Sequence, residues 1–450
     1  MPNAPIRNAD ALATDDRRAA AIEALTAGIA AAEPERAVRE TVAVAGDDLR
    51  VGDETVDLAG VERVLVVGGG KPAGRMARAL VDGLPDSVPV AGVVVTTEAV
   101  DAGPVDVVVG GHPLPDEAGL AGAERVLSAA EGADAETLVL AVVGGGGSGL
   151  LPAPADDLTL SDLRATTEAL LSAGSDIREI NAVRKHLSAL KGGQLAVAAA
   201  PATVHALVAS DVVGDDLATV ASGPTVPDPT TYDDARAAVE RAGADVPDGV
   251  RAHLRADAAG DGDHPETPTA DHPAFEDVTT HRILTSRRAV DAAAERAAAA
   301  GYEPLKLTTR LRGEAREVGR TLAGVVAEVR ASGDPVDPPA AVVAGGETTV
   351  TVSGDGAGGP NAELALSAAL SCDAEGWTLA ALDTDGRDGG TEYAGAVVDA
   401  GTVDGADDRE AARAALADND AHGYLCDRAA LVETGATGTN VNDLVVALVD

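Results

Sequence analysis

Short apolar runs that end in glycine-rich stretches mark the first half of this sequence, and they narrow its fold more than any other feature. The run VERVLVV at 61–67 leads directly into GGGK, and TLVLAVV at 137–143 leads into GGGGSG. Three further runs lie among helical patterns: AGVVVTT (91–97), VDVVVG (105–110) and TVHALVAS (203–210). Continuous β-branched runs that alternate with helices are typical of strands buried on both faces of a parallel sheet. The pattern therefore predicts an α/β, Rossmann-like fold with a doubly wound, mostly parallel sheet.

Chain length and a break in composition predict two domains. At 450 residues the chain exceeds what one hydrophobic core usually serves. The segment 257–278 is rich in Asp, Pro and Gly and is predicted to be a long exposed loop, partly disordered. The next break, ASGDPVDPPA at 331–340, is the best linker candidate. We therefore predict a larger N-terminal domain, 1–335, and a second α/β domain, 336–450.

The charge balance excludes several classes of partner. Asp and Glu number 74 against 34 Lys and Arg, which gives a formal net charge of −40. Binding to nucleic acid or to an anionic membrane needs a basic surface, so neither is expected. Acids spread along the chain, with Arg in place of Lys, are typical of a halophilic, haloarchaeal protein, although a GC-rich genome also disfavours Lys codons. The sequence has no membrane-spanning apolar run and no signal-peptide core, which favours a cytoplasmic protein.

The two glycine-rich stretches are candidate anion sites. GGGKPA at 68–73 matches the dinucleotide fingerprint in its letters, but the expected ribose-binding acid is represented only by Glu98, which comes late. Lys71 suits a phosphate better than a dinucleotide. GGGGSG at 144–149 lacks the Lys-Ser/Thr pair of a P-loop. Both stretches can present backbone N–H groups to an anion, and both are also compatible with tight turns that bind nothing.

Two aspartate-rich loops are candidate metal sites. DTDGRDGG at 383–390 places three carboxylates on a loop after a strand, and SDVVGDD at 210–216 offers Asp211 and Asp215 in the same way. Mg²⁺ takes one or two carboxylates together with phosphate oxygens and water, so either loop suits it. Taken singly, each loop is explained equally well as a turn.

A basic cluster is unexpected in so acidic a chain. The sequence has only four lysines, and two of them, Lys185 and Lys191, lie with Arg184 and His186 in NAVRKHLSALKGG at 181–193. Such a cluster either binds an anionic ligand or caps the C-terminus of a helix. A cap needs only one cation, so we favour an anionic ligand.

Nine stretches in a fixed order resemble the ATP-dependent glycerate 2-kinases whose C-terminal part is called the MOFRL domain. The resemblance extends from about Ala19 to Asp450, and its stretches are VVGGGKPAGRMA, GHPLPDEAG, VVGGGGSGLLPAPADDLTL, LLSAGSDIREINAVRKHLSALKGGQLA, ASDVVGDDLATVASGPTVPDPTTYDDA, LRGEAREVG, GGETTVTVSGDGAGGPNAELAL, DTDGRDGGTEYAGAVVD and TGATGTNVNDL. It implies transfer of the γ-phosphoryl group of ATP to the 2-hydroxyl of D-glycerate, with Mg²⁺, in a cleft between the two domains.

The resemblance also assigns roles to residues. Lys71 matches the family's active-site lysine, whereas Pro360 in GGPNAE stands where the family has a catalytic arginine. Because phosphoryl transfer depends on positive charge around the transferring oxygens, another arginine is expected to replace it, and Arg387 is the candidate. The predicted catalytic residues are Lys71, Arg184, Arg387 and Asp388, with Arg184 binding glycerate and Asp388 as the general base. The predicted nucleotide and substrate contacts are Gly69, Gly70, Gly145, Gly146, Ser148, Lys191, Thr437 and Asn440, and the predicted Mg²⁺ ligands are Asp211 and Asp385.

Two other functions stay open. One is a hydroxypyruvate reductase that uses GGGKPA as its NAD(P)H loop; the late Glu98 and the lack of a clear catalytic histidine argue against it. The other is a regulatory binder of sugar acids with an inactivated kinase site, an idea prompted by Pro360. The oligomeric state, a homodimer included, is also left open.

Overall fold

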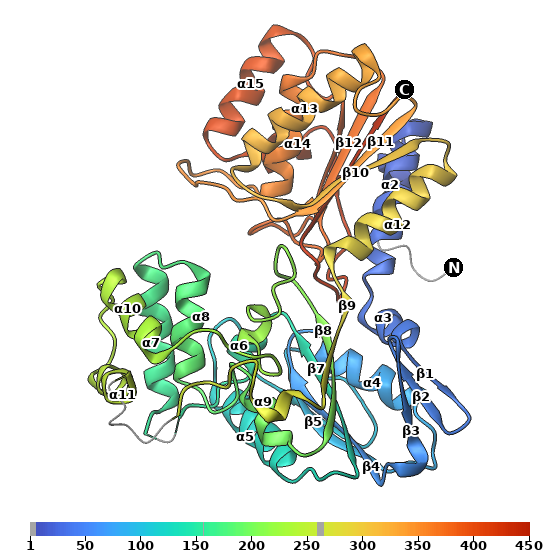
Figure 1. The fold of residues 1–450 in the computed structure, drawn as a ribbon. Coiled ribbons are helices and arrows are strands. Elements are labelled where there is room, and N and C mark those ends of the chain that lie inside the picture. Colours follow the sequence, from blue (N-terminus) through green and yellow to red (C-terminus); the bar gives the residue numbers. More distant parts are fainter. Residues whose placement is uncertain (1–5, 156, 259–264) are drawn as a thin grey trace. The chain divides into compact units, whose positions relative to one another are not determined.

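The computed structural model describes residues 6–155, 157–258 and 265–450, which form two compact units (Figure 1). One unit is Pro34–Ile283, and the other combines the residues up to Glu33 with Leu284–Asp450. Each unit contains a six-stranded sheet of its own. Within the described part of the chain, no helix is both long and apolar enough to cross a membrane.

The sheet of the Pro34–Ile283 unit confirms the predicted Rossmann-like fold. Its order is β6-β5-β4-β7-β8-β9, and the strands from β6 to β8 pair in parallel. Leu65 and Val67 pack with Ala123 and Val126 of a covering helix, in a core of small and aliphatic side chains. The strands are β4 (Arg63–Gly69), β5 (Val90–Thr96), β6 (Val105–Val109), β7 (Thr137–Gly144), β8 (Thr203–Ala209) and β9 (Val278–Leu284), and the helices α4 (Ala73–Gly83) and α5 (Glu117–Glu131) pack against them.

Residues 160–199 form three helices, and the breaks between them position the basic cluster. α7 (Leu160–Ser172) begins with a capping box in which the Thr159 hydroxyl accepts from the backbone N–H of Asp162. α8 (Ile177–His186) begins where the Asp176 carboxylate accepts from the Arg178 N–H at 2.8 Å. The third is α9 (Gln194–Ala199). α7 and α8 pack with α10 (Tyr232–Ala242) and α11 (Asp248–Ala258) around a separate apolar core.

The sequence patterns miss one sheet and overstate one loop. After α3 (Pro34–Thr41), three antiparallel strands of four residues each form a small sheet: β1 (Val42–Ala45), β2 (Asp48–Val51) and β3 (Glu54–Asp57). Part of the loop predicted over 257–278, residues 259–264, lies outside the described residues. Its later part is ordered, since Thr267 is buried and donates to Asp228 at 3.0 Å.

The second unit has a mixed sheet of order β10-β11-β15-β12-β13-β14. β10 and β11 are parallel, while β15 runs antiparallel to both of its neighbours. Alternate residues of these strands point to opposite faces of the sheet. Val342, Leu379 and Val445 belong to the core on the face that α13 and α14 cover, and α2 and α12 pack on the other face (Figure 1). The elements are α2 (Asp16–Ala31), α12 (Ser286–Ala299), β10 (Glu303–Leu311), α13 (Ala315–Ser332), β11 (Ala340–Gly346), α14 (Pro360–Ser371), β12 (Trp377–Asp383), β13 (Gly395–Asp399), α15 (Gly405–Ala417), α16 (Ala421–Cys426), β14 (Leu431–Val432) and β15 (Asp443–Val449).

These units correct the boundary predicted between residues 335 and 336. The Pro-rich segment 331–340 is the loop that joins α13 to β11, and β10 on its other side pairs with β11 in the same sheet. A parallel pair needs a crossover connection, which α13 provides. The N-terminal α2 also belongs to this unit, where Arg18 forms an ion pair with Asp399 at 2.5 Å. Composition marked a break in the chain, but strand pairing places both sides of the break in one unit.

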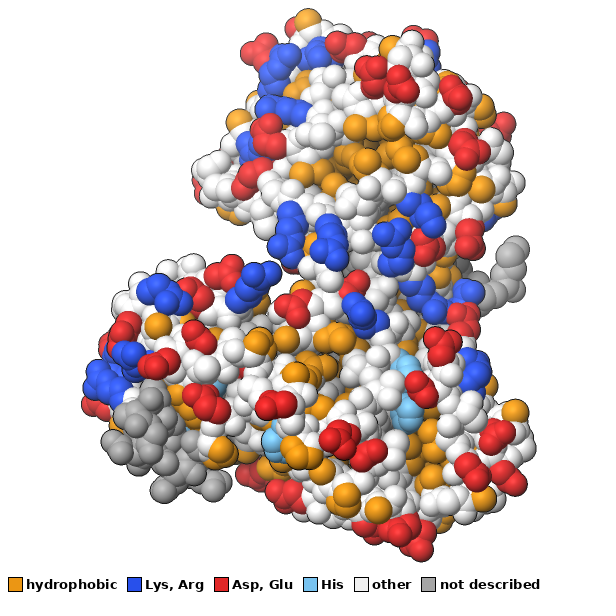
Figure 2. All heavy atoms as spheres, viewed as in Figure 1, with side chains coloured by type: hydrophobic (Ala, Val, Ile, Leu, Met, Phe, Trp, Pro, Cys, Tyr) orange, Lys and Arg blue, Asp and Glu red, His pale blue; other side chains and the backbone are white. Residues whose placement is uncertain are grey.

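The acidic residues are spread over the surface, as the sequence predicts. Figure 2 shows Asp and Glu side chains distributed over the visible face of each unit, with basic side chains among them. Some form exposed ion pairs, such as Arg78 with Glu35 at 2.6 Å and Arg236 with Glu240 at 2.8 Å. Exposed pairs contribute little to stability individually, so the excess negative charge is left for dissolved salt to screen.

Candidate active site

Two glycine-rich loops meet at the carboxyl end of the parallel sheet. One joins β4 to α4, and the other joins β7 to α6 (Gly147–Leu150). Gly70 has a φ of 142°, and a Cβ there would lie 2.6 Å from the carbonyl oxygen of Gly144. The backbone N–H of Lys71 donates to the carbonyl oxygen of Gly145 at 2.8 Å. Glycine is required at this crossing by the close approach of the two backbones, which brings the predicted Gly69, Gly70, Gly145 and Gly146 together.

Lys71, Asp211 and His112 lie together at this crossing. Asp211 follows β8, and a Cβ on Gly145 would clash with its carboxylate. Burial raises the pKa of Asp211, and the Lys71 ammonium opposes that rise. Burial and the nearby Lys71 both lower the pKa of His112. The structure therefore brings together two residues that were predicted separately, and it adds His112.

Ser148 belongs to a buried chain of hydrogen bonds. Its Oγ lies 2.8 Å from Oγ of Ser222, which donates to Oδ1 of Asn181 at 3.0 Å. Ser222 and its neighbour Ala221 have φ of 61° and 51°, a left-handed conformation that costs a non-glycine residue about 1–3 kcal/mol. The Nδ2 of Asn181 is buried with no hydrogen-bond partner among the described residues. Sequence analysis missed Ser222 and Asn181, although Asn181 is the first residue of the basic cluster.

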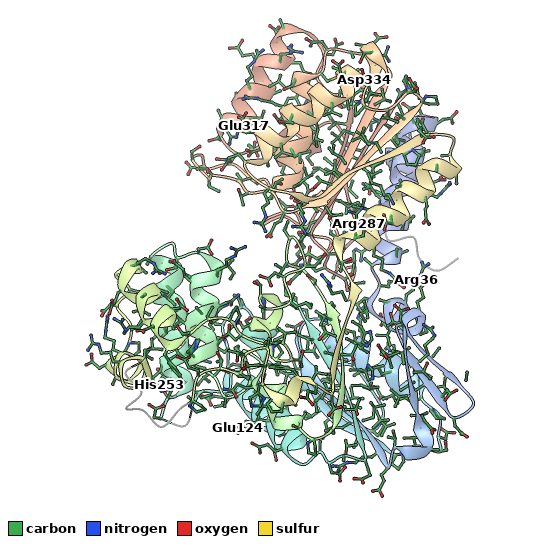
Figure 3. The ribbon with its side chains drawn as sticks, in the orientation of Figure 1. Arg36, Glu124, His253, Arg287, Glu317 and Asp334 are labelled. Atoms are coloured by element: carbon green, nitrogen blue, oxygen red, sulfur yellow. The ribbon has the colours of Figure 1, made fainter. Side chains whose placement is uncertain are left out.

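Lys185 and His186 have partners within the fold. Lys185 Nζ lies 3.0 Å from the Asp228 carboxylate, and both side chains are buried. His186 Nδ1 lies 2.8 Å from the carbonyl oxygen of Ala182, and its Nε2 lies 3.2 Å from the Glu266 carboxylate. His253, labelled in Figure 3, also contacts the end of α8: its Nε2 lies 2.9 Å from the carbonyl oxygen of His186. This half of the basic cluster therefore holds the end of α8 in place.

Arg184 and Lys191 face a cavity instead. They line it together with Ser148 and Thr166. The Lys191 ammonium donates to the backbone carbonyl of Leu151. Arg184 forms no ion pair with any residue in the described ranges. The structure thus places the predicted Arg184, Lys191 and Ser148 around one space.

The second unit has its own cluster of carboxylates, at the end of β12. Burial raises the pKa of Asp383 well above its usual range, and the neighbouring Asp385 and Asp443 raise it further. Burial also raises the pKa of Asp443 to about 7, although Asp443 accepts from the Thr348 N–H at 3.0 Å and from Asn361 Nδ2 at 2.7 Å. Sequence analysis missed Asp443 and Asn361, because a residue at the start of a buried strand and one at the start of a helix show no local pattern.

Asp388, the predicted general base, is hydrogen-bonded to the start of a helix. It is 2 % exposed, and its two oxygens accept from the backbone N–H groups of Asn361 and Ala362 at 2.8 Å each. These are the first free N–H groups of α14, so Asp388 caps that helix from a distant loop. Burial raises the pKa of Asp388 to about 6 against these hydrogen bonds. Both oxygens of Asp388 are therefore engaged by the start of α14, and its role as the general base stays a prediction.

The remaining predicted residues of this unit lie around the same loop. The Thr437 hydroxyl donates to the carbonyl oxygen of Thr384 at 2.6 Å, and Asn440 Oδ1 accepts from the N–H of Asn442 at 2.9 Å. Both side chains therefore brace the backbone. Arg387 is exposed and lines a hollow of about 330 Å³ with Arg7 and Tyr393. Among the described residues, no three or more His, Cys, Asp or Glu side chains are grouped as a complete metal site.

Comparison with known domain families matches most of the chain. Residues 20–255 match a family described as "Domain of unknown function (DUF4147)". Residues 340–443 match the family described as the MOFRL family.

Comparison with characterised and solved proteins gives the same result. The chain is 39 % identical to a D-glycerate 2-kinase of Thermotoga maritima, over 95 % of this chain and 97 % of the relative. It is 38 % identical to a glycerate 2-kinase of Pyrococcus horikoshii, over 94 % of each. A relative from Agrobacterium vitis, provisionally named a hydroxypyruvate reductase, is 43 % identical over 86 % of this chain and 87 % of the relative. The crystal structure of the Thermotoga maritima glycerate kinase superposes with a TM-score of 0.83 at 38 % identity, covering 96 % of this chain and 99 % of that one.

Proposed function

This chain belongs to the MOFRL family of glycerate 2-kinases, and from that membership we propose that it phosphorylates D-glycerate at the 2-hydroxyl, using ATP and releasing 2-phosphoglycerate and ADP. The observation that carries the proposal is the position of Lys71. It stands beside Asp211 where the two glycine-rich loops cross, in a chain that is similar to glycerate 2-kinases over nearly its whole length.

The geometry around Lys71 suits the phosphates of ATP. The loop backbone is fixed by the N–H of Lys71, which donates to Gly145, and by its carbonyl oxygen, which accepts from the Thr96 hydroxyl at 2.8 Å. Lys71 is followed by Pro72 and the N-terminus of α4, where free N–H groups favour an anion. An ammonium held in this way can neutralise charge on the transferring oxygens without reorganising, which is the main contribution a kinase makes.

The carboxylates of the chain fit Mg²⁺. Burial and then the neighbouring Asp385 raise the pKa of Asp383, and a bound divalent cation would offset both effects. Mg²⁺ commonly enters a site with the phosphates and uses only one or two carboxylates of the protein. We propose that Asp385, with Asp383 beside it, would hold the ion and that Asp211 is a separate candidate ligand. The ion would supply charge neutralisation for the phosphoryl group.

A reductase is the less favoured alternative. The name of the Agrobacterium vitis relative supports a reductase. The position of Glu98, the candidate acid for binding an NAD(P) ribose, argues against it. Glu98 lies beyond the end of β5 and its carboxylate is 3.4 Å from the guanidinium of Arg75. A ribose-binding acid should be free to accept from the sugar hydroxyls.

The experiment that tests the function uses the full chain with ATP, Mg²⁺ and D-glycerate. We expect ADP to form only when glycerate is present, and NADH to remain unconsumed with hydroxypyruvate. The phosphorus signal of the product should be split by one proton, as in 2-phosphoglycerate, rather than by two, as in 3-phosphoglycerate. The assay runs from about 0.1 M KCl into the molar range, and a higher rate is expected as salt screens the acidic surface. Glycerate binding without turnover would support a regulatory binder instead.

Two arginines are expected to affect different kinetic constants. Arg387→Ala removes a proposed transition-state contact, which should lower kcat and kcat/KM together by roughly 100-fold. Arg184→Ala removes a proposed contact with bound glycerate, which should mainly raise KM for glycerate. Steady-state rates with each substrate varied separate the two effects. The control is Arg413→Ala, an exposed position on α15. An unchanged kcat for Arg387→Ala shows that it does not replace the charge missing at Pro360.

A further inference from the structure

The cavity beside α8 has a lining unlike the rest of this acidic chain. It lies between α7, α8 and the backbone around Ser148, with a volume of about 30 Å³. Its lining contains two cations and not one carboxylate: Pro113, Pro115, Ser148, Gly149, Pro152, Leu163, Thr166, Thr167, Leu170, Val183, Arg184, Leu187, Ser188 and Lys191. In a chain of net charge −40 the cavity is therefore a local region of positive charge.

Lys191 and Lys185, six residues apart, have opposite environments. Lys185 is buried against the Asp228 carboxylate, which neutralises it. Lys191 is 3 % exposed, and its ammonium has the neutral carbonyl of Leu151 as its partner. Burying an ammonium without an anion is costly, and proteins normally pair such groups. The Lys191 ammonium would gain the missing partner if a ligand placed an anionic group beside it.

Hydroxyl groups in the cavity complete a site for a ligand that also carries oxygen. Thr166 Oγ1 is buried with no hydrogen-bond partner among the described residues, and Thr166 is 2 % exposed. Buried hydroxyls in proteins are almost always paired. Ser148 also lines the cavity; its hydroxyl donates to Ser222, which itself donates to Asn181, so Ser148 keeps only lone pairs to accept from a ligand hydroxyl. A volume of about 30 Å³ holds about two water-sized groups, which is the size of the two oxygens of a carboxylate.

We propose that this cavity binds the carboxylate of a small hydroxy acid, with Lys191 and Arg184 as its cations and the Thr166 hydroxyl as its donor. The proposal rests on the proposed function, since it names the part of glycerate that this site binds. It moves Lys191 from the nucleotide to the acid. It also adds Thr166 as a specificity-determining residue, because its buried, unpaired hydroxyl gains a hydrogen bond only from a ligand group that accepts one there.

The charges around Lys191 predict that binding takes up a proton. Burial, and then the neighbouring Arg184, lower the pKa of Lys191 to about 7. Of the other groups at this end of α8, the Lys185 ammonium faces the Asp228 carboxylate, and His186 Nε2 lies 3.2 Å from the Glu266 carboxylate. A bound carboxylate restores the charged ammonium and raises its pKa. Below pH 7 the ammonium is already charged, whereas at pH 8 most of it is neutral and must gain a proton when the acid binds.

Calorimetry of D-glycerate binding to the full chain without nucleotide tests this inference. At pH 8, titrations in buffers of different ionisation enthalpy should show uptake of close to one proton per site, falling toward zero at pH 6. Lys191→Met should abolish the uptake and weaken binding at least tenfold. Thr166→Val should weaken binding while keeping the uptake. Arg178→Ala, an exposed position on the same helix, is the matched control and should change neither.

Ligand controls separate this inference from the proposed function. Glycolate and lactate should bind with the same proton uptake, and glycerol, which has no carboxylate, should not bind. Glycerate binding without proton uptake, or with Lys191→Met unaffected, overturns the inference even if the kinase assay succeeds. Proton-linked binding in a chain that forms no ADP overturns the proposed function and leaves the acid site standing.

Discussion

Lys71→Ala is expected to lower kcat by about 100-fold or more. The side chain is half-buried beside Asp211 and His112, where its charge acts on both groups. Removing one preorganised charge or donor at a developing oxyanion typically costs about 2.7–4 kcal/mol of transition-state stabilisation. The measurement is the steady-state rate of ADP formation with saturating ATP and D-glycerate.

The fold should survive this substitution, which makes the rate interpretable. The loop is held by the backbone N–H and carbonyl of Lys71, and alanine keeps both. An unchanged circular dichroism spectrum and melting temperature confirm this. Lys71→Arg keeps a charge but changes its shape, so it should recover only part of the activity. A Lys71→Ala chain with near-normal turnover would reduce this loop to a tight turn with no ligand.

Lys185→Met is expected to destabilise the protein by about 3–5 kcal/mol, the usual effect of removing one partner from a buried ion pair. Asp228 would remain with 0 % of its side chain exposed and no cation. The hydroxyls of Thr230 and Thr267 would still donate to it, but neither carries charge. Denaturant unfolding at constant salt, followed by circular dichroism, measures the loss.

Lys191→Met provides the comparison for this prediction. It replaces a buried ammonium that has no carboxylate partner in the described part of the chain, so the free energy of unfolding should stay the same or rise. Lys185→Met combined with Asp228→Asn should regain part of the stability lost by the single change, because the buried charge is then absent as well. Equal losses for the two lysine variants would show that burial alone, rather than the missing counter-ion, decides stability here.

The sequence predicts the parallel strands well and the polar contacts poorly. β4 and β7 are buried along their length, so a continuous apolar run identifies them directly. In β2 buried and exposed residues alternate, and β3 is mostly exposed. Each strand has only four residues, which is too few for a two-residue hydrophobic period to be recognised. The glycine loops could be predicted because close backbone approach leaves glycine as the one suitable residue.

Tertiary contacts, which the local sequence does not show, decide what the candidate site residues bind. Asp388 sits in a loop suited to a metal, yet its oxygens bind N–H groups of a helix whose first residue lies 28 positions earlier in the chain, Pro360. Lys185 and Lys191 look equivalent in NAVRKHLSALKGG, and only the tertiary structure shows that Asp228 reaches one of them. Thr166 belongs to no sequence motif. It stands out only in the structure, where its hydroxyl is buried with no hydrogen-bond partner among the described residues.

The strand order of the second sheet has a consequence for the growing chain. β15 lies between β11 and β12 but follows every other strand of this sheet in the chain, so the sheet lacks an inner strand until residues 443–449 have been made. The Pro34–Ile283 unit is complete much earlier and can fold while the ribosome is still working. α2 packs against β12 and β15 as well as α12, so α12 can cover it before the two strands that complete its surroundings have been made. A helix made early in the chain is therefore among the last elements of its unit to be fully buried.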